Sequence, residues 1–213
     1  MLNHEQANYQ SQSLNLQTYP GEPIYVPDML VAIVALKQYS KLYNGKYSET
    51  VKKWVNRARK DWCDEETGLL VSFLNLDGSQ IKYAPIKGSY SALNCSYLTY
   101  IDEGFARKQY DILKKLFWKE GFISGFKEYY DRSCPLGLDI DAGPIINDLS
   151  PSGTAFGMGA VTYFADEEVR TEILKTAEIA GHSIIWNRTQ HYALANVALV
   201  GEAIMLAMRT HLK

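Results

Sequence analysis

The chain alternates two kinds of expected helix, and this alternation constrains its fold more than any other feature. Stretches 27–43, 88–101 and 151–164 are apolar, rich in small residues and carry few charges. After a short break, each is followed by a stretch with one apolar and one charged face, at 48–62, 102–117 and 166–181. A helix that is apolar all round is buried, whereas a striped helix lies outside. The pattern therefore predicts helical hairpins, each with an inner and an outer member.

The hairpins repeat along the chain. Their first members begin about 60 residues apart, a period typical of stacked helical hairpins, and a last apolar helix at 197–209 lacks a second member. The simplest assembly is an all-α fold, an α/α toroid (barrel) or a partial toroid of helical hairpins. Asp77-Gly78, between two β-prone runs, adds a small β-hairpin in the first loop between hairpins. We expect residues 1–22 to be a polar N-terminal arm and residues 23–213 to be a single domain.

Composition and motifs argue against several classes of function. The 213 residues carry 22 Lys and Arg against 24 Asp and Glu, without the basic cluster that nucleic-acid binding needs. No apolar run approaches the roughly 20 residues that cross a bilayer, and no signal-peptide pattern is present, so we expect a soluble chain of unknown compartment without membrane insertion. The sequence has no nucleotide-binding, zinc-protease or nucleophile-elbow motif, and we expect neither cofactor nor metal. Three separated cysteines predict no disulfide framework, and the reactivity of Cys95 stays open.

Loop lengths indicate where function lies. The links between hairpins, at 63–87, 118–149 and 182–195, are long and precede inner helices, so they share one rim with the positive ends of those helices. In the longest link Asp139 and Asp141 are two residues apart, and on an extended strand they face the same way. With Glu128 of the same link they are our candidate catalytic groups, because paired acids suit general acid and base chemistry. Alternatively, one aspartate caps a loop and the other pairs with Arg132 or a lysine.

Other residues of this rim are candidates for binding a substrate: Tyr25, Asp28, Tyr90, Tyr129, His191 and Glu202. Each also has a structural interpretation. Asp28 suits the first turn of a helix, where the dipole favours an acid. Tyrosines are ordinary semi-buried residues, and a lone histidine such as His191 is more often structural than catalytic. Glu202 lies within an apolar helix, where a charge is seldom without a partner or a purpose.

Four segments carry a resemblance to a known family: "YVPDMLVAIVALKQY", "KGSYSALNCSYLTYID", "DIDAGPI" with "SPSGTAFGMGAVTYF", and "GEAIMLAMRT". They resemble the toroid segments of uncharacterised bacterial proteins similar to the linalool dehydratase/isomerase group. That resemblance implies an α/α barrel that holds a small isoprenoid alcohol in a central pocket and uses acid-base chemistry without a metal or an organic cofactor. The paired-cysteine signature of that group is not recognisable around Cys95, so no catalytic residue is transferred.

Two classes of function therefore remain open. The first is a cofactor-free hydrolase, lyase or isomerase with a central pocket on the loop-rich rim, acting on a glycan or a small isoprenoid-type alcohol. It predicts a carboxyl group of raised pKa. The second is a non-catalytic helical module that completes or binds another polypeptide, with salt-bridged acids and an apolar contact face. The chain has too few expected helices to close a ring of six hairpins. The ring is therefore incomplete, is built with fewer hairpins, or is completed by a homo-oligomer or a partner chain.

Overall fold

The computed structural model describes residues 14–181, 183–192 and 195–212. It describes no side chain at 183, 186, 190–200 or 202. No helix within the described ranges is long and apolar enough to cross a membrane.

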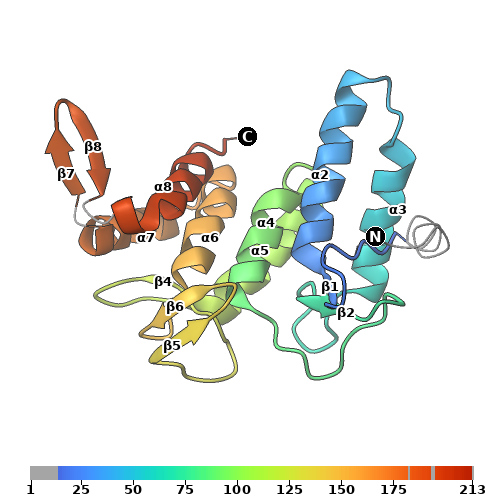
Figure 1. Ribbon diagram of the computed structural model, residues 1–213, viewed down its shortest axis with the longest axis horizontal. Coiled ribbons are helices and arrows are strands. Elements are labelled where there is room, and N and C mark those ends of the chain that lie inside the picture. Colours follow the sequence, from blue (N-terminus) through green and yellow to red (C-terminus); the bar gives the residue numbers. More distant parts are fainter. Residues whose placement is uncertain (1–13, 182, 193–194, 213) are drawn as a thin grey trace.

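Four helices form a row of neighbours, in the order in which they occur along the chain (Figure 1). They are α2 (Val26–Leu42), α4 (Gly88–Leu98), α6 (Pro151–Tyr163) and α8 (Ala195–Arg209). The tightest contact is between α4 and α6, because α6 is rich in glycine and alanine and its backbone can come close. Helices α2 and α8 lie at opposite ends of the row.

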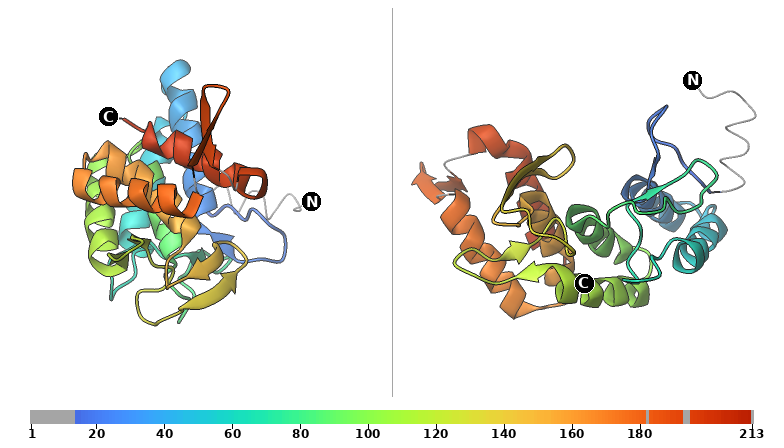
Figure 2. Two further views of the ribbon diagram at one scale, coloured as in Figure 1. Left: turned by 90° about the vertical axis from the view of Figure 1, so that its left-hand side faces the viewer. Right: turned by 90° about the horizontal axis from the view of Figure 1, so that it is seen from below.

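A second layer covers one side of this row (Figure 2). It consists of α3 (Ser48–Asp61), α5 (Glu103–Phe117) and α7 (Glu167–Gly181), and each of these packs on the inner helix that precedes it. Local capping explains where two of the helices begin. The side chain of Asp102 accepts a hydrogen bond from the Phe105 N–H at the start of α5, and Ser150 Oγ accepts one from the Gly153 N–H at the start of α6. Large buried side chains between the layers, among them Trp54, Tyr110 and Phe117, form the core.

The prediction of an all-α toroid is wrong, because the chain is a mixed fold with 51% helix and 13% strand. The described residues include four two-stranded antiparallel sheets. One joins β1 (Ile24–Tyr25) to the distant β2 (Phe73–Leu74). The other three are local hairpins: β3 (Trp118–Lys119) with β4 (Gly125–Phe126), β5 (Leu136–Asp139) with β6 (Gly143–Ile146), and β7 (Ser183–Trp186) with β8 (Thr189–Tyr192).

All described strands except β1 lie in the long links, because the backbone N–H and C=O groups of these links need partners that the helices do not supply. The hairpin predicted around Asp77-Gly78 is reduced to an isolated bridge between Leu74 and Gln80, since Phe73 and Leu74 pair with β1 instead. Of the N-terminal arm predicted at 1–22, residues 1–13 lie outside the described part of the chain. Within the rest of it, Asn15 is buried and Leu14 packs against the core.

Candidate functional site

The first residues of α2, α4 and α6 lie at the same edge of the helix row, the lower edge in Figure 1, and the β5–β6 hairpin lies beside them. Ser72 holds two of these helix starts together. Its carbonyl accepts a hydrogen bond from the Val26 N–H, and its hydroxyl accepts one from the Lys87 N–H at 3.0 Å. Lys87 is the N-cap residue of α4 and has an extended backbone. This places its side chain at the junction of the two helices and the hairpin.

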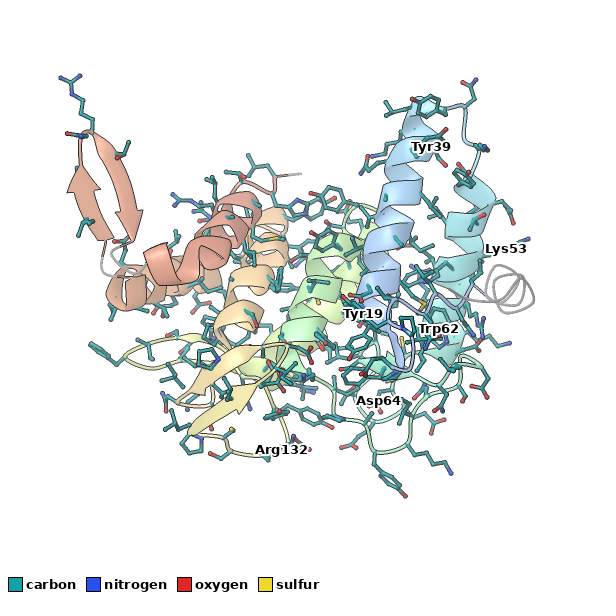
Figure 3. The ribbon with its side chains drawn as sticks, in the orientation of Figure 1. Tyr19, Tyr39, Lys53, Trp62, Asp64 and Arg132 are labelled. Carbon is teal, nitrogen blue, oxygen red and sulfur yellow. The ribbon has the colours of Figure 1, made fainter. Side chains whose placement is uncertain are left out.

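Lys87 pairs with both candidate aspartates. Its Nζ lies 2.8 Å from Asp139 Oδ1 and 2.8 Å from Asp141 Oδ2, and the lysine side chain is only 6% exposed. Asp139 Oδ1 also accepts hydrogen bonds from the backbone N–H groups of Asp141 and Ala142, each at 2.9 Å. Asp139 therefore both caps the hairpin turn and binds the lysine. Arg132, labelled in Figure 3, instead lies over the Tyr129 ring, 3.8 Å from the ring centroid.

The electrostatics of the pair follow from these contacts. Burial alone would raise the pKa of Asp139, but the hydrogen bonds from Lys87 and from the two backbone N–H groups outweigh it and lower that pKa. Burial likewise opposes the charge on Lys87, yet the hydrogen bonds from its ammonium to both carboxylates raise its pKa. Asp139 and Lys87 are thus an ion pair at neutral pH.

Aromatic rings line the other side of the lysine. Tyr25, Phe73 and Tyr90 form a mutual edge-to-face cluster with centroids 5.1, 5.5 and 6.2 Å apart. The Lys87 Nζ lies 5.1 Å from the Tyr90 ring centroid and 5.9 Å from that of Phe73, within the range of cation–π attraction. Burial, together with the charge of Asp141 and a hydrogen bond to it, raises the pKa of Tyr90, so its hydroxyl stays protonated.

Asp28 lies in the first turn of α2, three residues after Tyr25. Its Oδ2 is buried without a hydrogen-bond partner among the described residues. Burial raises the pKa of Asp28, and a hydrogen bond with Thr18 only partly opposes this effect. Asp28 and Asp139 therefore occupy the same rim with pKa values shifted in opposite directions.

Glu128 is fully buried and supports the start of α4. Its carboxylate accepts hydrogen bonds from the Ser89 hydroxyl at 2.9 Å and from the Ser89 N–H at 3.2 Å, and its carbonyl accepts one from the Gly88 N–H. Burial raises the pKa of Glu128, although hydrogen bonds with Ser150 and Ser89 oppose this. Gly88 is required here, because a Cβ at that position would lie 1.9 Å from the Lys127 carbonyl oxygen.

Six of the nine residues predicted for the site gather near Lys87, and these are Tyr25, Asp28, Tyr90, Tyr129, Asp139 and Asp141. Tyr129 joins through its hydroxyl, which donates to Asp139 Oδ2 at 3.2 Å. Glu128 lies behind Ser89 as a support. The side chains of His191 in β8 and Glu202 in α8 lie outside the described part of the structure.

Phe73 was missing from the predicted site, and Lys87 entered the prediction only as the unnamed lysine that could pair with an aspartate. For Lys87 the sequence carries a usable signal, because a lysine at the positive end of a helix is unfavourable unless acids pair with it. Phe73 has no such signal, since it reaches the cluster through the pairing of β2 with β1.

The cysteines are not part of this cluster. Cys95 is fully buried in α4, and burial raises the pKa of its thiol, which disfavours the reactive thiolate. Within the described ranges no group of three His, Cys, Asp or Glu side chains is arranged to hold a metal ion. In chemical terms the cluster offers a charged lysine that is balanced by two aspartates, an ionised carboxylate, a carboxyl group of raised pKa and aromatic walls.

Comparison with known proteins adds no family to this description: no family model matches the chain, and no curated protein matches it.

Proposed function

We propose that the residues gathered around Lys87, which we call the rim cluster, are the site of an enzyme that uses carboxylate acid-base chemistry on a small hydroxylated molecule, a glycan or an isoprenoid-type alcohol. Besides Lys87, the rim cluster consists of Tyr25, Asp28, Phe73, Tyr90, Tyr129, Asp139 and Asp141. The observation that carries this proposal is the buried Asp28 Oδ2 atom, which has no hydrogen-bond partner among the described residues and belongs to a carboxyl group whose pKa is raised by burial. A carboxyl group whose surroundings raise its pKa can hold its proton and act as a general acid.

The contacts support distinct roles. Asp28 retains its proton more readily than an ordinary aspartate and has a buried oxygen without a partner, so it suits the general acid. Asp139 and Asp141 are committed to Lys87, which makes them positioning groups for the lysine rather than free nucleophiles. Tyr25, Phe73 and Tyr90 supply apolar walls for the carbon skeleton of a ligand.

A ligand screen by thermal shift tests the proposal. Methyl glycosides, short glycan fragments and geraniol are added separately to wild type, to Asp28→Asn and to Asp131→Asn. Asp131 is an exposed acid of the same long link, and its variant is the matched control. We expect one probe class to raise the melting temperature of wild type and of the control, because a ligand stabilises the folded state that binds it.

Product formation from the binding probe is then followed as a function of pH. Asp28→Asn should abolish turnover, because an amide cannot act as the general acid. The control Asp131→Asn should turn over the probe as fast as wild type. Turnover that is equal in Asp28→Asn and wild type, or the absence of any stabilising probe, would rule out the proposed site.

A second candidate function, a non-catalytic module that binds another polypeptide, is favoured by the outer face of the β5–β6 hairpin. Leu136, Leu138 and Ile140 are 81%, 84% and 98% exposed there. Contiguous exposed apolar side chains commonly mark interaction sites. Light scattering of wild type and Leu138→Ser over a range of concentrations tests self-association: this candidate predicts a mass that rises with concentration for wild type alone.

A further inference from the structure

One side of α4 carries a row of polar residues that continues inward from the rim. Lys87, Tyr90, Ser91 and Asn94 occupy positions i, i+3, i+4 and i+7, so they share a helix face. The first two belong to the rim cluster, through their contacts with Asp139, Asp141 and Tyr25. The side chains of Ser91 and Asn94 therefore extend the same face one turn deeper.

Both deeper residues are buried without partners. Asn94 is 1% exposed and Ser91 is 3% exposed, yet Ser91 Oγ, Asn94 Oδ1 and Asn94 Nδ2 have no hydrogen-bond partner among the described residues. Buried polar groups are nearly always paired, so each such exception calls for an explanation.

Asp28 approaches the same depth from α2. Helices α2 and α4 start at the same rim and run in the same direction (Figure 1), and the rings of Tyr25 and Tyr90 lie 6.2 Å apart. Asp28 is three residues beyond Tyr25, and Asn94 is four residues beyond Tyr90, so equal rise along both helices places them at similar depth. Half of the eight unpartnered buried atoms found in the described residues thus belong to Asp28, Ser91 and Asn94.

From this arrangement we infer that Ser91 and Asn94 are specificity-determining residues that bind a polyhydroxylated ligand, a sugar unit with neighbouring hydroxyl groups. The inference rests on the proposed function and selects between its two substrate classes. A primary amide offers two donors and an acceptor, and a serine hydroxyl offers both roles. One alcohol hydroxyl cannot satisfy these atoms together with Asp28 Oδ2, whereas adjacent hydroxyls of a sugar can.

The remaining chemistry of the site agrees with an uncharged sugar. The charge of Lys87 is already balanced by Asp139 and Asp141, so this lysine is not available to bind an anionic group. The rings of Tyr25 and Tyr90 provide faces against which the C–H groups of a sugar ring can pack. The competing explanation is a permanently bound water molecule that pairs with Asn94 and Ser91.

Calorimetric titration with defined probes tests the inference. The probes are the methyl glycosides of glucose, galactose, mannose and xylose, and geraniol as the single-hydroxyl alcohol. The variants are Asn94→Leu and Ser91→Ala. Asn15→Leu is the matched control. Asn15 is also buried with both amide atoms unpartnered, but it lies beside Gly78 and outside α4, the helix of Ser91 and Asn94.

We expect at least one glycoside to bind wild type and the Asn15→Leu control about ten times more tightly than geraniol binds them. Asn94→Leu and Ser91→Ala should each bind that glycoside about ten times more weakly than wild type does. The melting temperature without ligand should not fall in Asn94→Leu, because an apolar side chain of similar size replaces an unpaired amide.

Three outcomes would overturn the inference. If geraniol binds and no glycoside does, the proposed enzyme stands but its ligand is not a sugar. If neither probe class binds, the proposed function fails together with the inference. If a glycoside binds Asn94→Leu and Ser91→Ala as tightly as wild type, or if Asn94→Leu melts well below wild type, the two residues are structural and hold a water.

Discussion

The two sides of α4 carry similar residues in opposite circumstances. On the side that faces α6, Ser96 Oγ donates to the Phe156 carbonyl at 2.6 Å and accepts from the Ala160 N–H at 2.9 Å. On the side that faces the rim cluster, Ser91 and Asn94 have no partner among the described residues. The side toward α6 uses its polar groups to join two closely packed helices. The side toward the rim cluster has polar groups that the described residues leave without partners, which is the arrangement expected of a binding site without its ligand.

A buried polar side chain therefore does not always stabilise the contact between two elements. Ser91 and Ser96 are both buried on the same helix, 3% and 1% exposed, yet only Ser96 connects two helices. Four predictions test how far the contrast extends, and they are ordered by the size of the change in stability that each should cause.

Gly159→Leu should have the largest effect, because it adds a large side chain to the close contact between α4 and α6. A Cβ at Gly159 would lie 2.6 Å from Ser96 Oγ and 2.6 Å from Met208 Sδ. Overpacking of this kind costs about 3 kcal/mol of the free energy of unfolding, measured by denaturant titration. The control is Gly104→Leu in the first turn of α5, where a Cβ approaches only Asp102 Oδ1, at 3.7 Å. Equal losses in both variants would mean that the α4–α6 contact is not especially tight.

Lys87→Met should lower the free energy of unfolding by about 2 kcal/mol, because it leaves Asp139 and Asp141 near the helix start without their cation. The folded pKa of Asp139 lies below its ordinary value of 3.8, so the stability that this carboxylate contributes is present above that value and is lost as the pH falls through the folded pKa. The gap between wild type and variant should therefore close below about pH 3.8.

Lys119→Met is the matched control for this ion pair. Lys119 Nζ lies 2.8 Å from Asp148 Oδ2, but the lysine side chain is 29% exposed, and such pairs contribute less than about 1 kcal/mol. If the control loses as much stability as Lys87→Met, burial of the Lys87 pair is not what gives it strength.

Ser96→Ala and Ser91→Ala compare the two sides of α4 directly. Loss of the Ser96 hydroxyl removes two hydrogen bonds across the α4–α6 contact and should cost about 1 kcal/mol, whereas Ser91→Ala should change stability by less than about 0.5 kcal/mol. Thermal and denaturant unfolding of both variants provide the measurement. A loss at Ser91 equal to that at Ser96 would indicate a partner for the Ser91 hydroxyl, such as a bound water.

Asp28→Asn should have the smallest effect on stability and the opposite sign. Because the folded pKa of Asp28 is raised above 3.8, the unfolded chain ionises first, and the group reduces stability as the pH rises from about 3.8 through its folded pKa. The variant should melt up to about 2 °C higher than wild type at pH 7, and the difference should vanish towards pH 3.8. A lower melting temperature at pH 7 would contradict the raised pKa.

Helix positions were predictable because their signals are local. The expected starts at Ser48, Asp102 and Ser150 agree with α3, α5 and α6 within one residue. Apolar periodicity and capping residues act within one or two turns, so they can be recognised without tertiary information. The strands were mostly missed for the opposite reason. Strands of two residues, such as β1 and β2, have no period to detect, and their paired residues are 48 and 50 positions apart in the sequence.

The candidate site was predicted only in part. The clustering of Asp139 and Asp141 at the loop-rich rim followed from their spacing and from loop lengths. Their shared partner Lys87 lies more than 50 positions away, and neither this pairing nor the opposite pKa shifts of Asp28 and Asp139 can be read from local patterns.

Local sequence patterns were thus enough to predict the alternation of apolar and striped helices and the concentration of acids and tyrosines at one rim. Which carboxylates pair with a lysine, and which buried polar atoms of the described residues stay without a partner, depended on the folded arrangement. The two kinds of property differ in the sequence distance over which their interactions act. Helix formation and capping depend on neighbours within a few residues, whereas desolvation and ion pairing depend on atoms that the fold brings from distant segments, such as Lys87 to Asp139.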